Sequence, residues 1–337
     1  MKRRIIKQGH NTLTITLPSE WVKRFNLKPG EEIDLSERES GLFISAEIKG
    51  DDLKRTELDI TDLDIPSLWK YFMAIYREGY DEIKVIFPPN CTYDSPYKFF
   101  STHSIDTKYG KSTRKHTPFE TIQEITNRFI GFEVIEHHKD YCIIRDLSQP
   151  SPKEFDSSLR RVFLLLQQMG EEIIEAITTN KVEIIRHTHD VDINVDKFHD
   201  YCARVLNKTE LKESKKGKLI FTILYMLELI GDEFKSIANH LITDMQEQKL
   251  TNIRPLAELL IEQLNKFIDL YYNFTKEKVV ELSKRDIEIH FYLPQLYKKS
   301  KGKKSPLSDS ELEVFNHFRR ISKYLNAATE LRIELES

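Results

Sequence analysis

The sequence predicts a multidomain α+β protein, in which strands dominate one end of the chain and helices the other. Apolar and polar residues alternate with a period of two near the N-terminus, where Thr12–Pro18 reads TLTITLP. The middle of the chain mixes strand and helix periods, and the periodicity is helical from about residue 152 onward. We therefore divide the 337 residues into a strand-rich domain at 1–48, a small α/β module at 51–148 and a helical bundle at 152–337.

The composition is that of a globular protein whose charge is nearly balanced. Hydrophobic residues make up 39% of the chain, and 51 Lys and Arg face 54 Asp and Glu. Total charge therefore does not decide for or against a nucleic-acid partner, but Lys2, Arg3, Arg4 and Lys7 meet no acidic residue near the N-terminus. The cysteines are widely spaced and odd in number, and we find no apolar leader and no apolar run of membrane-spanning length. We expect a cytoplasmic protein with no membrane insertion.

The first 48 residues predict two small β-hairpins joined by a short helix. Pro18 ends the first alternating strand, and Ser19 is expected to cap the helix that follows. A Lys-Pro-Gly turn at 28–30 leads into a second hairpin at 31–45. A unit of this size cannot bury both faces of its strands, so we expect a second copy of the chain to complete the core.

These elements resemble the SpoVT/AbrB family of swapped-hairpin DNA-binding domains. The resemblance rests on TLTITLP, on SEWVKRFNLKPGEEIDL directly after it, and on RESGLFIS. It implies a dimeric, swapped-hairpin β-barrel whose DNA-facing side is built from basic residues of the N-terminal hairpin of both subunits. A domain that dimerises without binding DNA is the alternative. The candidate DNA-binding residues are Arg3, Arg4 and Lys7, then His10, Asn11 and Thr12 at the turn, and Lys23 and Arg24 on the short helix.

Residues 51–148 predict a small α/β module. A long polar segment at 88–118 interrupts it and is expected to be a mobile loop or a hairpin extension. The phrases REGYDEIKVIF and NRFIGFEVIEHHKDYCIIRDL resemble the connecting region of archaeal proteins in which a SpoVT/AbrB-like domain is fused to a helical domain of another family. We expect strands at 53–60, 83–87, 132–136 and 141–145 and helices at 66–78 and 119–129.

The last part of the chain predicts two sets of three antiparallel helices, because that arrangement gives each apolar helix face a partner. The Lys-rich stretch at 298–306 is expected to be a flexible connection. We expect helices at 153–180, 182–208, 216–245, 254–284, 286–298 and 308–335.

The phrase LELIGDEFKSIA at Leu227–Ala238 resembles the metal-carboxylate motif of the PhoU family of phosphate-uptake regulators, LERIGDxxxNIA. Glu228 and Asp232 are four residues apart and therefore project from one face of a helix. Leu229 replaces the family's Arg and Ser236 its Asn, which puts the roles of those two positions in doubt. The whole chain thus resembles archaeal-type PhoU-family proteins with an N-terminal SpoVT/AbrB-like domain, and the resemblance implies a bundle of two three-helix repeats.

The resemblance also implies a metal site made of carboxylates. The partner motif is expected on the preceding helix, where Asp192 and Asp196 keep the same spacing. Adjacent carboxylates repel one another, and hard oxygen ligands suit Fe, Mn, Zn or Mg, so we expect such a metal and no organic cofactor. A solvated acidic face is the alternative. Further candidates are His189, Asp190 and His199, with Asp286 and His290 in the second repeat, where Arg319 and Lys323 occupy the positions that match Glu228 and Asp232.

Together the two resemblances predict a DNA-binding transcriptional regulator of phosphate uptake or phosphate homeostasis that senses through a metal-binding helical domain. The alternative is an adaptor that docks on a phosphate transporter or a signalling kinase and uses the N-terminal domain only to dimerise. We find no GxSxG, P-loop, GxGxxG or HExxH motif, so we do not expect an enzyme. An antitoxin also fits the N-terminal domain, but such proteins end in a short tail and this chain continues into large domains.

Overall fold

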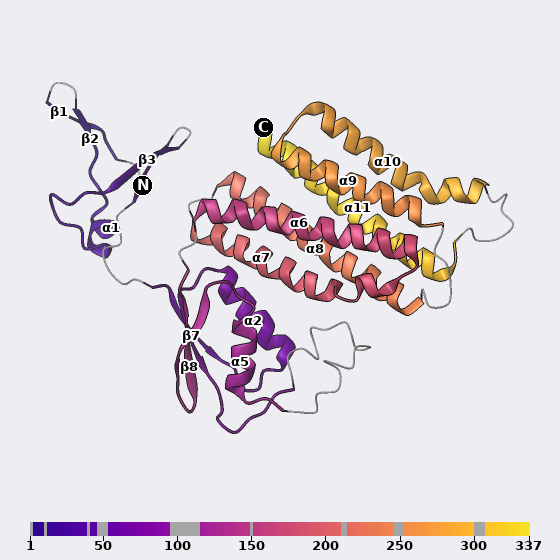
Figure 1. The fold of residues 1–337 in the computed structure, drawn as a ribbon. Helices are drawn as coiled ribbons and strands as arrows, with labels where there is room; N and C mark the ends of the chain where they lie inside the picture. The colour runs from indigo at the N-terminus through magenta and orange to yellow at the C-terminus, as the bar shows by residue number, and fades with distance from the viewer. Residues whose placement is uncertain are drawn as a thin grey trace. The chain divides into compact units, whose positions relative to one another are not determined.

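The structure is a computed structural model of the chain and describes residues 3–9, 12–38, 41–45, 53–94, 115–148, 151–209, 214–244, 252–299 and 307–337. The chain forms two compact units, Met1–Leu53 and Lys54–Ser337, which we describe separately (Figure 1). The predicted α+β class is confirmed, because the first unit contains small β-hairpins and the second is dominated by a large helical part. Among the described helices, we find none that is both long enough and apolar enough to cross a membrane.

The N-terminal unit consists of two antiparallel hairpins on either side of a short helix. Its elements are β1 (Ile6–Gln8), β2 (Thr12–Thr14), α1 (Ser19–Arg24), β3 (Asp34–Arg38) and β4 (Gly41–Ser45). Lys7 pairs with Leu13 in the first hairpin. The expectation that Ser19 caps the helix is wrong: Pro18 is the N-cap residue, Ser19 is already helical, and no side chain caps the helix end. Proline fits this place because its fixed φ, here −63°, suits the start of a helix.

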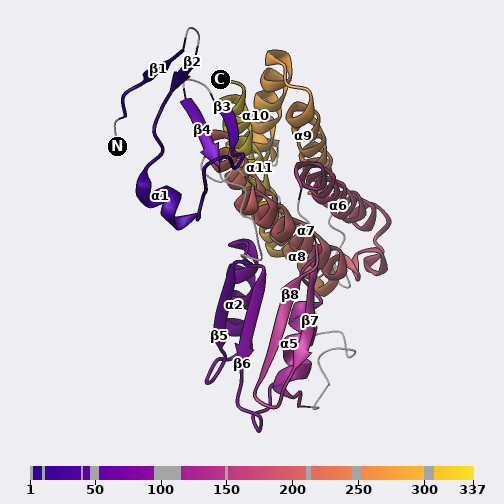
Figure 2. The same ribbon diagram turned by 90° about the vertical axis from the view of Figure 1, so that its left-hand side faces the viewer.

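The α/β module begins the second unit with a four-stranded sheet in the order β5-β6-β8-β7. β5 (Arg55–Asp59) and β6 (Glu82–Ile86) are parallel and joined by α2 (Ile65–Arg77), whereas β7 (Phe132–His137) and β8 (Tyr141–Asp146) add antiparallel pairs. Both α2 and α5 (Pro118–Thr126) lie against the same face of the sheet (Figure 2). Most of the predicted polar loop, residues 95–114, lies outside the described residues.

In the described residues after 151, six long helices and one 3-10 turn follow, in two sets of three. They are α6 (Pro152–Thr179), η1 (Val182–Ile185), α7 (Thr188–Lys208), α8 (Lys215–Asp244), α9 (Arg254–Tyr272), α10 (Lys276–Lys299) and α11 (Asp309–Glu336). The helix expected at 182–208 is therefore split, because η1 precedes α7. The expected break near residue 285 is also misplaced: α9 ends at Tyr272, and the Thr275 hydroxyl accepts a hydrogen bond from the backbone N–H of Lys278 at 3.3 Å, which caps α10.

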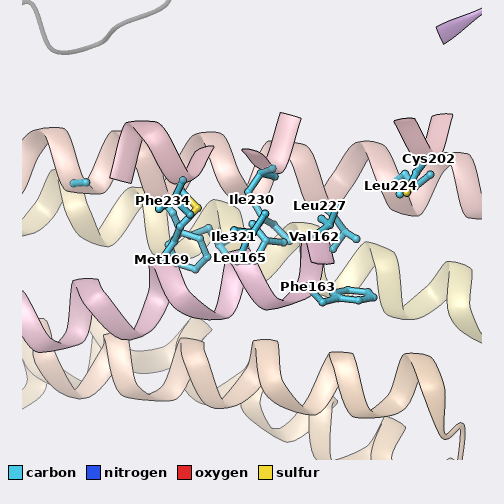
Figure 3. Packing of buried hydrophobic residues seen from close by; sticks show 14 of the residues in the cluster. Val162, Phe163, Leu165, Met169, Cys202, Leu224, Leu227, Ile230, Phe234 and Ile321 are labelled. Carbon is cyan, nitrogen blue, oxygen red and sulfur yellow. The ribbon is translucent and has the colours of Figure 1, made fainter. Parts of the chain in front are cut away.

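The bundle core is formed by apolar side chains that interdigitate between helices (Figure 3). Val162, Leu165 and Met169 of α6 are buried together with Leu227, Ile230 and Phe234 of α8 and Ile321 of α11. Gly231 allows α7 and α8 to approach closely, since a Cβ atom there would lie 3.3 Å from Val195 Cγ1 and 3.5 Å from Asp192 Oδ1. This close approach places the acidic residues of α7 beside those of α8.

Candidate functional site

The basic residues of the N-terminal arm that the structure describes are exposed. Arg3 and Arg4 precede β1, Lys7 lies within it, and Lys23 lies on α1. Thr12 is the first residue of β2 and is also exposed. The remaining DNA candidates fall outside the described part: His10 and Asn11 entirely, and Arg24 in its side chain.

The N-terminal unit leaves its apolar side chains uncovered. No described residue of this unit is buried, and the exposed fraction reaches 67% for Ile5 and Leu13 and 59% for Leu35. A hollow of about 320 Å³ opens beside α1 and β4 and is lined by Leu17, Pro18, Trp21, Leu42 and Ile44. An exposed apolar surface of this kind is typical of a site that binds another protein surface or a ligand.

The predicted metal ligands lie on the adjoining faces of α7 and α8. Asp192 is buried at the start of this acidic face, whereas the Asp232 side chain is 46% exposed and opens the face to solvent. Lys235, one turn after Asp232 on α8, joins the two helices: its Nζ donates to Asp192 Oδ2 at 2.7 Å and to Asp232 Oδ1 at 2.5 Å. We did not predict this role, although Lys235 lies within the phrase LELIGDEFKSIA and its three-residue spacing from Asp232 was a visible signal.

Burial and mutual repulsion shift the pKa values of this face. Burial raises the pKa of Asp196 well above its usual value, and the negative charge of Asp192 adds to the effect. Burial and the charge of Asp232 raise the pKa of Glu228, and burial raises the pKa of Asp192 although Lys235 opposes it. For Lys235, burial lowers the pKa but Asp192 and Asp232 raise it by more, so its pKa lies above the usual value and the ammonium form is retained.

The acidic stripe of α7 continues to Asp200, where it meets the α/β module. Asp200 is buried and accepts a hydrogen bond from Arg77 Nε at 2.6 Å, and Arg77 is the last residue of α2. His199 Nδ1 lies 3.2 Å from the same carboxylate oxygen. Asp200 extends the four-residue spacing of Asp192 and Asp196 and could have been found from the sequence, whereas Arg77 belongs to a distant segment and gave no local signal.

A fully buried arginine of the bundle forms an ion pair and hydrogen bonds with the α/β module. Arg204 of α7 donates to Asp146 Oδ2 at 2.6 Å and to the backbone oxygens of Tyr76 and Tyr80 at 2.6 and 2.7 Å. Although burial alone would raise the pKa of Asp146, hydrogen bonds from Ser148 and the Arg204 guanidinium together hold it below the usual range. Residues Asp200, Arg204 and Lys208 of α7 therefore all form ion pairs with the module, and we call this set of contacts the ionic joint.

The additional metal candidates have other surroundings or partners where the structure describes them. His199 is paired with Asp200, and Asp190 is exposed at the start of α7; the side chain of His189 lies outside the description. Asp286 and His290 are on α10, where Asp286 Oδ1 accepts a hydrogen bond from Ser322 of α11 at 3.1 Å. The second repeat therefore uses Asp286 to join two helices.

In the part of the chain that the structure describes, no three His, Cys, Asp or Glu side chains gather so that they could hold a metal ion. At the acidic face, the Lys235 ammonium takes the position between Asp192 and Asp232 that a bridging cation would need. This arrangement does not fit a bound metal, and metal binding by Asp192, Asp196, Glu228 and Asp232 stays a prediction.

Comparisons with known proteins match the two ends of the chain separately. Residues 6–50 match the family described as antidote-toxin recognition MazE, bacterial antitoxin. The chain is structurally similar to PhoU from Pseudomonas aeruginosa, with 14% sequence identity, a TM-score of 0.46 and coverage of 55% of this chain and 96% of that one. It is also similar to the phosphate transport system regulatory protein PhoU from Streptococcus pneumoniae, with 18% identity, a TM-score of 0.46 and coverage of 55% and 94%. No curated protein matches the sequence.

Proposed function

We propose that the protein is a DNA-binding transcriptional regulator of phosphate uptake or phosphate homeostasis. Two copies join through their N-terminal units to bind DNA, and the helical bundle receives the signal. The observation that carries the proposal is the combination, in one chain, of an exposed basic arm on an uncovered apolar unit with a bundle that contains the phrase LELIGDEFKSIA.

The exposed apolar surface supports the dimeric part of the proposal. A second copy would cover Leu13 and Leu35 and the hollow beside Trp21, and burying apolar area stabilises a complex by about 25 cal/mol per Å². The match of residues 6–50 to the MazE family fits this arrangement, because domains of the AbrB and MazE type are typically dimeric and bind DNA. Dimerisation also doubles the basic arm, so that Arg3, Arg4 and Lys7 of both chains supply six positive charges.

The ionic joint supports the sensing part of the proposal. A change of charge at Asp192 or Asp196 acts on Asp200, one or two turns along α7, and Asp200 holds Arg77 of the α/β module. The α/β module precedes the bundle in the chain and directly follows the N-terminal unit. We propose that the module carries the signal from the bundle to the DNA-binding end.

The DNA-binding part is tested with the full chain and DNA from upstream of its own gene. Replacing Arg3, Arg4 and Lys7 by Ala removes six charges per dimer, which should weaken binding to all sequences and reduce the slope of log K against log salt by about 5. The control replaces Lys276, Lys284 and Lys298, three exposed lysines of α10, and should leave both affinity and slope unchanged. An unchanged slope in the arm variant would contradict the proposal.

The phosphate part needs a separate measurement, since it rests on the resemblance of the bundle. Transcripts of phosphate-uptake genes should change in a strain that lacks this protein, and the difference should depend on phosphate supply. Transcripts that are the same with and without the protein would contradict this part. An adaptor that docks on a phosphate transporter or a signalling kinase is supported instead if the purified full chain dimerises but shows no salt-dependent DNA binding.

A further inference from the structure

The acidic face of α7 and α8 is neutralised by positive side chains of the same chain. Five carboxylates influence one another there, and three cationic side chains act on them together with His199 of α7. Lys235 comes from α8, whereas Arg77 and Arg128 come from the α/β module. The carboxylates are Asp192, Asp196, Asp200, Glu228 and Asp232.

Lys235 is the one of these cations that lies between the two helices. Its ammonium is within hydrogen-bonding distance of one carboxylate on each helix, Asp192 on α7 and Asp232 on α8. Asp192 has only 3% of its side chain exposed, and an ionised carboxylate so deeply buried is strongly destabilising without a partner. Lys235 therefore supplies the positive charge that lets Asp192 stay ionised while it is buried between α7 and α8.

We propose that Lys235 is the resident counter-ion of this acidic face and takes the place of a metal ion. A divalent cation would have to bind the same oxygens of Asp192 and Asp232, and it would repel the ammonium at a few ångströms. Lys235 is covalently part of α8 and its side chain is only 19% exposed, so the ammonium does not exchange with solvent as a free ion would. The protein as purified should hold no metal at this face.

The proposal leads to an expectation for the lysine that a purely surface ion pair would not produce. Lys235→Met replaces the apolar stem of the lysine by an unbranched apolar side chain of similar length and removes the charge. The variant should be less stable in chelator and should gain a binding site for a divalent cation, because Asp192 and Asp232 have then lost the ammonium that lies between them. One substitution would thus convert a face that excludes metal ions into one that binds them.

The experiment uses the tag-free full chain after treatment with chelator. Titration calorimetry with Mn²⁺ and with Zn²⁺ measures binding, and thermal unfolding with and without each metal measures stabilisation. The matched control is Lys216→Met, an exposed lysine on the same helix, α8. The parent and Lys216→Met should show no stoichiometric binding and no shift in Tm with metal.

For Lys235→Met we expect a Tm lower than that of the parent by about 5 °C or more in chelator, and a metal-dependent recovery of roughly 4 °C. A second variant, Lys235→Met with Asp192→Asn, removes both partners and should be closer to the parent in Tm and bind metal more weakly than Lys235→Met. If Lys235→Met does not fold, a folded double variant supports the proposal and an unfolded one contradicts it.

Two results would overturn the proposal. One is a parent protein that carries a stoichiometric metal which is lost in Asp232→Asn. The other is a Lys235→Met variant that folds with the Tm of the parent and binds Mn²⁺ and Zn²⁺ no better than the parent does. The outcome is independent of DNA binding, so that it can fail or succeed without deciding the proposed function.

Discussion

The two compact units of the chain differ in how they obtain a core. Residues 54–337 bury a continuous set of apolar side chains that runs from Leu58 in the sheet to Ala328 in α11. The described residues of the first unit bury none, and leave Ile5, Leu13 and Leu35 more than half exposed. The comparison indicates that residues 54–337 have a core of their own, whereas the N-terminal unit needs a further apolar surface to complete one, and we propose that a second copy of the chain supplies it.

The largest expected effect is a loss of stability in residues 54–337, the unit that has its own core. Arg204→Met removes four hydrogen bonds and takes the guanidinium from the buried Asp146, which keeps only Ser148 and the more distant Lys208, so the free energy of unfolding should fall by about 3–5 kcal/mol. Denaturant unfolding at neutral pH measures it. Arg55→Met is the control, since its ion pair with Glu82 is 54% exposed on the arginine side and should contribute less than about 1 kcal/mol. Equal losses in the two variants would show that the joint does not hold the module.

A smaller effect concerns the pH dependence of the same unit. The pKa values of Asp192, Asp196 and Glu228 are raised in the folded state, so this state binds their protons more tightly than the unfolded state does. Their contribution favours folding at low pH and is lost as the pH rises through the folded pKa values. Asp196→Asn should therefore stabilise the protein relative to the parent, and the gain should grow from about pH 4 to neutral pH.

The control for this experiment has the opposite sign. The side-chain hydrogen bond from Ser67 lowers the pKa of Asp64, so its contribution is present above the ordinary carboxyl range and is lost as the pH falls. Asn can still cap the helix at this position. The stability of Asp64→Asn relative to the parent should therefore be nearly unchanged at acidic pH and should fall as the pH rises. Unfolding curves of Asp196→Asn, Asp64→Asn and the parent between about pH 4 and neutral pH measure both differences. A gain from Asp196→Asn that does not depend on pH would contradict the description of the acidic face.

The sequence was sufficient where the signals are local. The strands of the α/β module and most bundle helices follow from periodicity, and the capping boxes at Ser151 and Ser308 lie where the periodic segments begin. The break between α9 and α10, with Thr275 as the cap of α10, was not predicted because the apolar periodicity continues across it. Helix breaks of this kind are decided by a single cap, which periodicity does not contain.

The candidate site was predictable only in part. The four-residue spacing placed Asp192 with Asp196, and Glu228 with Asp232, each pair on one face of its helix, and the resemblance to the PhoU motif implied that the two faces adjoin. It could not show that Lys235 neutralises two of them, since that depends on how closely α7 and α8 approach at Gly231. Contacts with the α/β module depend on tertiary packing across more than a hundred residues of sequence.

The measurement that tests the contrast between the two units most directly is sedimentation velocity at micromolar concentration. The full chain should sediment at twice the chain mass of 39.8 kDa, and a chain that begins at Lys54 should be a folded monomer with a thermal transition close to that of the parent. A monomeric full chain, or a shortened chain that dimerises as tightly as the full one, would contradict the account.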